Sequence, residues 1–288
     1  MLPIIFALIT YFTWGSGDVL TAVGSRKIGA YSMSLWVVVF ATLFSALYLP
    51  FAPASILSIE PYTFLLILGL GVINALAWYF FNRGLEIGNA TLVGTIAATY
   101  SSLVVLFSIT FLGESITLTQ ALAIALTLIG VVLVTLDFKT IKSGLKLDKG
   151  TISGILTMIL WGIYFTLIKI PVQKVGWYWP GTIVVIVMAI LYFAFMKTKK
   201  IQIKNPLIKG SKLLVPMASL LSVVGAFSLN HAFGIGQSSI VAPISGSYPT
   251  LYILLSYFVF RERVTKQQVL GILLTLVGIV ALAFSIGA

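Results

Sequence analysis

Cysteine is absent from this 288-residue chain, histidine occurs once, and only seven residues are acidic. Without cysteine there is no disulfide framework, no thiolate ligand for zinc and no thiol nucleophile. The single histidine, His231, leaves no multi-histidine metal site. No glycine-rich phosphate loop with its lysine occurs, so ATP coupling within this chain is not expected. We therefore expect no enzyme activity, no metal and no cofactor, although a Ser–Lys pair stays open.

Charged residues are also scarce, at 9% of the chain, whereas 59% of the residues are hydrophobic. A soluble protein has about a quarter of its residues charged, and the mean hydropathy here is +1.10. These values indicate an integral membrane protein whose first partner is the lipid bilayer. The net charge of +11 comes mostly from short connections between apolar runs, so membrane topology explains it better than nucleic acid does.

Ten apolar runs are long enough to cross a hydrocarbon core of about 30 Å at about 1.5 Å per helical residue. In lipid every backbone polar group needs a partner within the protein, and runs of this length are too long for barrel strands. The runs are therefore expected to be helices, and the fold class all-α. Their approximate ranges are 3–23, 34–51, 62–82, 91–112, 119–136, 150–170, 179–196, 213–234, 239–260 and 267–286.

One stretch of the sequence occurs twice. Shifted by 148 residues, 82–130 falls on 230–278, with 18 of 49 positions identical. With a shift of 147, the Trp14-Gly15 pair also falls on Trp161-Gly162. Each half then holds five helices, and because five is odd, the second half must enter the membrane from the opposite face. The sequence predicts two inverted five-helix repeats, an arrangement associated with alternating-access transporters.

The repeat also predicts the domain boundaries and leaves the membrane orientation open. Residues 1–136 form the first repeat, 137–149 a charged linker and 150–288 the second repeat. Of the 18 Lys and Arg residues, all but Lys169 and Lys174 lie in or beside connections on one face. The positive-inside rule makes that face cytoplasmic, which places both termini outside.

Two segments carry a resemblance to a known family. The sequences FLGESITLTQALAIALTLIGVVLV (111–134) and VFRERVTKQQVLGILLTLVGIVAL (259–282) resemble the end of the EamA module of the drug/metabolite transporter superfamily. The repeated Trp-Gly pair is similar as well, whereas Arg261 stands where the first half has Gly113. The resemblance implies ten helices around a central cavity formed mainly by helices 1, 3, 4, 6, 8 and 9. It also implies cytoplasmic termini, in conflict with the charge count.

Polar residues at helical spacing support such a cavity. On the third run Asn74, Trp78 and Asn82 are four residues apart and share one face. Polar groups are costly in hydrocarbon, so these stripes face either water in a cavity or a partner helix. The candidate substrate-binding residues are Trp14, Asp18, Asn74, Trp78, Asn82, Tyr100, Trp161, Tyr164, Asn230 and Tyr248.

Four ionisable residues have predicted roles of their own. Asp18 is the one carboxylate well inside a run, and we expect it to couple a proton or bind a substrate cation; the alternative is a structural, hydrogen-bonded Asp. His231 is a second proton-coupling candidate, or a helix cap. Glu114 and Glu262 end equivalent helices, and each is expected to lock its helix end to a neighbour's backbone or to a basic residue such as Arg83 or Arg263, or to act as a gate.

The predicted function is secondary transport of small organic metabolites, such as amino acids, aromatic or amphiphilic compounds, by alternating access. We expect export, coupling to protons and a location in the cell membrane as a multi-pass monomer or homodimer. Sugar uptake is the main alternative, because Trp and Tyr rings stack on sugars. A non-transporting scaffold is a second alternative. Phosphorylated sugars are disfavoured, since they need a basic clamp.

Overall fold

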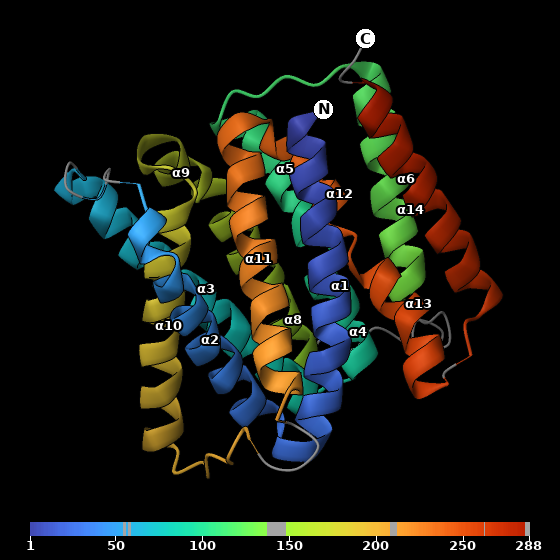
Figure 1. Cartoon of the computed structure of the whole chain (residues 1–288). Helices are drawn as coiled ribbons and strands as arrows, with labels where there is room; N and C mark the ends of the chain where they lie inside the picture. Colours follow the sequence, from blue (N-terminus) through green and yellow to red (C-terminus); the bar gives the residue numbers. More distant parts are fainter. Residues whose placement is uncertain (54–55, 57–58, 137–147, 208–211, 262, 286–288) are drawn as a thin grey trace.

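The computed structural model describes residues 1–53, 56, 59–136, 148–207, 212–261 and 263–285. In these residues the regular structure is helical and no strand occurs (Figure 1). Glu262 and most of the predicted linker, 137–147, lie outside the described residues. The first half contains α1 (Leu2–Ile28), α2 (Ala30–Leu47), the short η1 (Leu49–Phe51), α3 (Pro61–Ile87), α4 (Ala90–Ala98), α5 (Tyr100–Phe111) and α6 (Leu118–Thr135).

The second half is also helical in its described residues. It contains α8 (Lys149–Leu167), α9 (Lys169–Val175), α10 (Tyr178–Thr198), α11 (Leu214–Ile235), α12 (Ser238–Gly246), α13 (Pro249–Phe260) and α14 (Lys266–Ser285). Nine segments of the described chain are long and apolar enough to cross a membrane. The helices α12 and α13 follow one another, but each is shorter than such a span.

Three of the predicted runs are interrupted rather than continuous. The run 91–112 divides into α4 and α5 at Thr99, whose hydroxyl bonds to the Ile96 carbonyl at 2.7 Å. The run 239–260 divides before Pro249, which begins α13, because proline has no N–H to continue the helix. The run 150–170 divides at Ile168, between α8 and α9. The break between α4 and α5 and the break between α12 and α13 thus fall in runs that the sequence repeat makes equivalent.

The repeated Thr and Gln residues are explained by capping. Thr117 caps α6: its hydroxyl accepts the Gln120 N–H at 3.2 Å, and the Gln120 side chain accepts the Thr117 N–H at 2.9 Å. Thr265 and Gln268 make the same two bonds at the start of α14, at 3.2 and 2.9 Å. Such a capping box satisfies two backbone N–H groups that a helix start otherwise leaves free.

Contacts between helices keep the same pattern when the two halves are exchanged. The helix α1 packs on α11 as α8 packs on α3, and α2 packs on α11 as α10 packs on α3. The pair α6 and α14 lies side by side at one edge of the bundle, at the right of Figure 1. There a Cβ at Gly130 would collide with Thr275, and one at Gly278 would collide with Thr127. Small residues let these two helices approach closely.

Candidate functional site

A cavity of about 170 Å³ lies at the centre of the bundle. Helices of both halves form its wall, so it lies between the two halves of the chain. The wall residues are Trp14, Gly17, Asp18, Thr21, Ser34, Val37, Val38, Ala41, Asn74, Trp78, Tyr100, Trp161, Tyr164, Phe165, Gly181, Val184, Val185, Met188, Tyr192, Ala218, Ser222, Val223, Ala226, Phe227, Leu229, Asn230 and Tyr248.

Nine of the ten candidate substrate-binding residues lie in this wall. The tenth, Asn82, is turned toward α10: its side-chain amide donates to the Trp78 carbonyl at 2.9 Å and to the Tyr192 hydroxyl at 3.0 Å. The helical spacing was correct, but the stripe ends one turn before Asn82. Whether the nine residues contact a substrate stays a prediction.

The helices α2 and α10 also line the cavity, which the sequence reasoning missed. They contribute mainly small and apolar residues, such as Val38 and Val184. Among the residues that line the cavity from these two helices, only Ser34 and Tyr192 are polar. An apolar residue that faces a cavity looks the same in sequence as one that faces lipid, so little in the sequence indicated this part of the wall.

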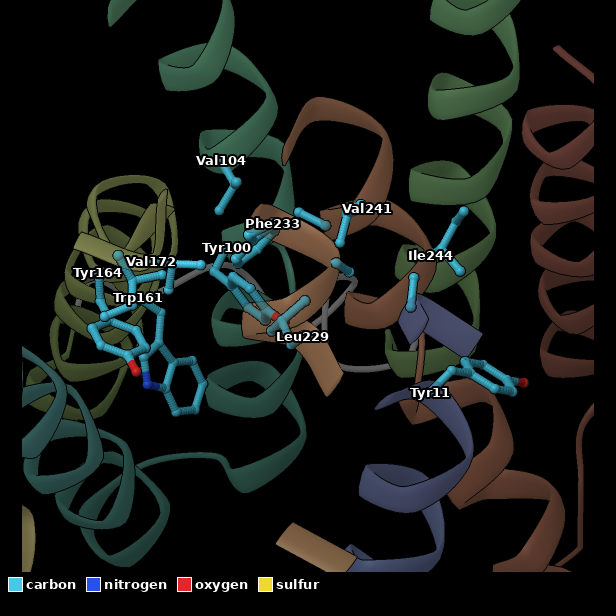
Figure 2. Packing of buried hydrophobic residues seen from close by; sticks show 14 of the residues in the cluster. Tyr11, Tyr100, Val104, Trp161, Tyr164, Val172, Leu229, Phe233, Val241 and Ile244 are labelled. Atoms are coloured by element: carbon cyan, nitrogen blue, oxygen red, sulfur yellow. The ribbon is translucent and has the colours of Figure 1, made fainter. Parts of the chain in front are cut away.

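Aromatic rings in the cavity wall contact one another. Trp161 is central among them: its ring centroid lies 5.4 Å from that of Trp78 and 5.7 Å from that of Tyr100. Figure 2 shows Tyr100 on α5 and Trp161 and Tyr164 on α8. On the other side, Trp14 meets Tyr248 edge to face at 5.6 Å. Such arrangements are favoured by the aromatic quadrupole, and they give the cavity rigid, flat walls.

Several polar side chains of the wall bond to another helix or to a connection between helices. The Asn74 carbonyl accepts from the Trp161 indole N–H at 3.2 Å. The Trp14 indole N–H donates to the Ser222 carbonyl at 3.3 Å, and the Asn230 amide donates to the Trp177 carbonyl at 3.2 Å. Both interpretations of the polar stripes therefore hold here, because the same residues line the cavity and join helices.

Asp18 differs from these residues. Within the described part of the chain no hydrogen bond or ion pair is made to its carboxyl. It is also the one charged side chain among the described residues of the cavity wall. The Tyr100 hydroxyl is fully buried and likewise has no hydrogen-bond partner among the described residues. The cavity thus contains one acid without a protein cation.

His231 does not lie in the cavity wall. Its ring packs edge to face on Phe6, with centroids 4.3 Å apart, and lies 6.2 Å from the Trp177 ring. Its position near the end of α11, among aromatic residues, gives it a packing role in this conformation.

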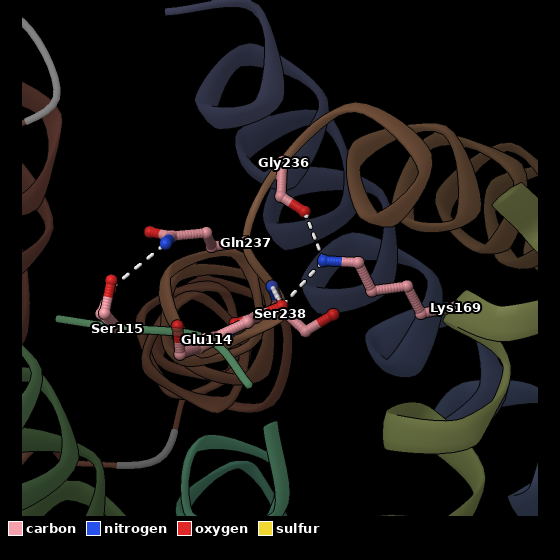
Figure 3. Close-up of polar contacts among 7 residues, drawn as sticks. Glu114, Ser115, Lys169, Gly236, Gln237 and Ser238 are labelled. Atoms are coloured by element: carbon pink, nitrogen blue, oxygen red, sulfur yellow. Dashed lines mark hydrogen bonds and ion pairs between the residues drawn. The ribbon is translucent and has the colours of Figure 1, made fainter. Parts of the chain in front are cut away.

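Glu114 lies outside the cavity and joins the two halves (Figure 3). Its carboxylate accepts the Ser238 and Ser239 N–H groups at the start of α12, both at 2.8 Å. The Lys169 ammonium lies 2.6 Å from the same carboxylate and donates to the Gly236 carbonyl at 2.8 Å. Burial raises the pKa of Glu114, but the hydrogen bonds from Lys169, Ser239 and Ser238 outweigh it, so the pKa lies below its ordinary value.

The basic partner of Glu114 is therefore Lys169, and not Arg83 or Arg263 as the sequence suggested. Arg83 pairs instead with Glu86, three residues later on α3, at 2.9 Å. The backbone partner was predicted, because Glu114 does tie its helix end to a neighbouring helix. The equivalent Glu262 lies outside the described residues.

The sequence matches the EamA-like transporter family twice, over residues 1–136 and 148–284. The chain belongs to the EamA-like transporter family. The resemblance to EamA modules of the drug/metabolite transporter superfamily is thereby confirmed. This EamA-family protein is a multi-pass membrane protein of a transporter family.

Two further proteins are similar to this EamA-family chain. An uncharacterized protein of Methanocaldococcus jannaschii, MJ1333.1, is 30% identical over 142 residues, which are 99% of that protein and 48% of this chain. That relative is thus about as long as one half of this chain. A solved structure, described as "Crystal structure of protein", has a TM-score of 0.81 and 13% identity, with 99% of both chains covered. At that identity the likeness shows the fold alone.

Proposed function

We propose that the protein is a secondary transporter that moves small organic metabolites across the cell membrane by alternating access. The observation that carries this proposal is the central cavity between the two halves, which has aromatic walls and a single carboxylate. Sites for small molecules are concave and mostly apolar, with a few polar groups that fix the orientation of the ligand. The cavity has these properties, and transporters with inverted repeats bind their substrates between the two repeats.

The wall chemistry supports amino acids, aromatic compounds and amphiphilic cations as substrates. Trp and Tyr faces attract cations as well as apolar rings. No Lys or Arg occurs among the described residues of the wall, so a phosphate finds no basic clamp there. Phosphorylated sugars are therefore disfavoured. Export is the direction we propose.

Asp18 is the proposed coupling residue. A carboxylate among apolar groups needs a cation, a proton or water to offset the cost of its charge. Because no protein cation reaches Asp18 among the described residues, a proton and a positively charged substrate group would compete for it. Competition for one carboxyl links the movement of protons in one direction to that of substrate in the other.

Alternating access is supported by the symmetry of the helix contacts. We propose ten spanning helices in two inverted five-helix repeats, in which α12 and α13 together make one span. The exchange-symmetric packing of α1 on α11 and of α8 on α3 supports this arrangement. The boundaries 1–136, 137–149 and 150–288 stay predictions, as do the orientation and a monomeric or homodimeric state. We further propose that the Glu114–Lys169 contact is a lock. It would break when the cavity opens on the side of the protein where these two residues lie.

The proposal is tested with purified protein in liposomes. Labelled amino acids, organic cations and sugars are offered with and without a pH gradient, and we expect a cation or an aromatic amino acid to move faster with the gradient. Asp18→Asn should remove the response to the gradient, whereas Glu60→Gln, at an exposed carboxylate outside the cavity wall, should keep it. If Asp18→Asn keeps that response, Asp18 is not the coupling residue. Movement of sugars alone favours the uptake alternative, and failure of every class with folded protein favours a scaffold.

A further inference from the structure

A second hollow, of about 220 Å³, lies between α3 and α10. Its wall consists of Tyr31, Val72, Ala75, Leu76, Tyr79, Leu191, Tyr192 and Phe195. Val72, Leu76 and Leu191 are exposed, so the hollow is a groove on the protein surface. The helix α10 lies at the edge of the bundle opposite the α6–α14 pair (Figure 1). Both α3 and α10 are candidate membrane spans, so this groove faces the bilayer.

Two of the three hydroxyl groups in the groove wall are already bonded. The Tyr31 hydroxyl donates to the Glu86 carboxylate at 2.9 Å. The Tyr192 hydroxyl accepts from the Asn82 amide at 3.0 Å. The wall therefore presents mainly carbon, and a ligand that buried polar groups in it would lose hydrogen bonds with water without replacement. The chemistry that fits the groove is a hydrocarbon chain.

The groove ends in aromatic rings, and basic residues follow. The Phe195 ring lies 5.2 Å from the Tyr79 ring and 5.9 Å from the Tyr31 ring. Side chains four residues apart on a helix lie on the same face. Arg83 follows Tyr79 by four residues on α3, so the two share a face. Lys199 directly follows the last residue of α10 and comes four residues after Phe195; both basic residues are exposed.

This end of the groove is rich in positive charge. The residues after α10 include Lys200 as well as Lys199, and the acid on the same helix as Arg83, Glu86, is paired with it at 2.9 Å. A guanidinium has five N–H donors, so Arg83 can bind Glu86 and a phosphate together. Arg and Lys near a membrane surface attract anionic lipid headgroups.

We propose that the groove between α3 and α10 binds one anionic phospholipid, with an acyl chain along α3 and its phosphate at Arg83 and Lys199. From Val72 to Arg83 the helix rises about 16 Å at about 1.5 Å per residue. That is about half of a hydrocarbon core of about 30 Å, the depth of one leaflet. The length, the apolar wall and the charge at one end together fit one lipid molecule.

The lipid would also contact a residue of the central cavity wall from its outer side. Tyr192 lies in the walls of both the groove and the cavity, and Asn82 holds its hydroxyl. An acyl chain in the groove packs against the outer face of the Tyr192 ring and keeps it in place. This assignment depends on the membrane position of the helices and not on the transported substrate.

Native mass spectrometry of the detergent-purified full chain tests the proposal. Phosphatidylglycerol and phosphatidylcholine with the same acyl chains are titrated separately, and we expect one phosphatidylglycerol to be retained at lower lipid concentration. Arg83→Gln and Lys199→Gln should each weaken that retention about fivefold, the effect expected of one basic residue at an anionic surface. Lys27→Gln, an exposed lysine at the same end of the bundle, is the matched control and should change nothing.

Two variants test the groove itself. Leu76→Trp fills it and should abolish retention of the single lipid, and Leu191→Trp, from the facing helix, should do the same if the first variant does not fold. Leu65→Trp, exposed on α3 but outside the groove, should retain the lipid as the wild type does. Equal retention of both lipids by the wild type would overturn the assignment of an anionic lipid, because phosphatidylcholine has the phosphate but no net charge. Unchanged retention by folded Leu76→Trp and Leu191→Trp would overturn the acyl-chain site.

Discussion

The first turns of α4 and α12 occupy equivalent positions in the two halves, yet they are capped by different means. The start of α4 is capped locally, because the Asn89 side chain accepts the Leu92 N–H at 3.1 Å. The start of α12 is capped by Glu114, a residue of the other half. A local cap stabilises only its own helix, whereas the Glu114 cap depends on how the two halves are placed relative to each other.

The surroundings of the two caps differ as well. Ser238 and Ser239 are fully buried, and the side chains of Glu114 and Lys169 are only 7% and 10% exposed. Asn89 is exposed. When a buried hydrogen-bond partner is removed, the group that it bonded is left without any partner. When an exposed partner is removed, water can bond to that group instead. The comparison therefore predicts a large effect at α12 and a small one at α4.

Glu114→Ala should have the largest effect on stability. It leaves the Lys169 ammonium without its counter-charge and frees two buried N–H groups at the start of α12. Removal of one partner of a buried ion pair costs about 3–5 kcal/mol. Thermal unfolding of purified protein in micelles measures the loss, with Glu60→Ala, at an exposed ion pair, as the control. Equal stability of the two variants would mean that the contact between the halves contributes nothing.

Lys169→Met should cost less than Glu114→Ala, about 1–3 kcal/mol. The carboxylate then keeps both backbone N–H groups, and the positive end of the α12 dipole still favours its charge. The same unfolding measurement compares the two variants directly. If Lys169→Met were as unstable as Glu114→Ala, the ion pair, rather than the helix cap, would hold the two halves together.

The sequence predicted much of the α12 cap but not its lysine. Glu114 was found because it recurs as Glu262, and a recurring acid at a helix end indicates a polar partner. Lys169 lies within the second half's first helical run, and the repeat places Ala22 at the equivalent position. A residue that one half lacks gives no signal in the duplication. The pairing of Lys169 with Glu114 became visible only in the structure, where α9 packs against α11.

The cavity residues follow the same rule, because only side chains that stand out in an apolar helix were predicted. Trp161 and Asp18 were predicted because polar and aromatic residues are conspicuous in an apolar helix. Val38 and Val184 were not predicted, because a valine in a membrane helix can equally face lipid. Asn82 was placed in the cavity by its spacing alone. Its partner Tyr192 lies on α10, and no residue pattern in that run predicted that it lines the cavity.

Acid should weaken the α12 cap in a way that Glu114→Gln abolishes. The pKa of Glu114 in the folded protein lies below the ordinary value of 4.5. A lowered pKa means that the stabilisation is complete above about pH 4.5 and is lost as the pH falls through the folded pKa. The unfolding temperature of the wild type should therefore fall in this acidic range by more than that of Glu114→Gln. Parallel falls in both proteins would assign the loss to other carboxylates, such as Asp148.

Asn89→Ala should have the smallest effect, about 1 kcal/mol, which is the usual cost of an N-cap side chain. Water can reach the freed Leu92 N–H, because Asn89 is exposed at the end of α4. Asn89→Asp keeps the acceptor and should restore the wild-type unfolding temperature, which separates capping from any change in the preceding connection. A loss as large as that of Glu114→Ala would show that the start of α4 also holds the two halves together, and the difference between the two ends would then disappear.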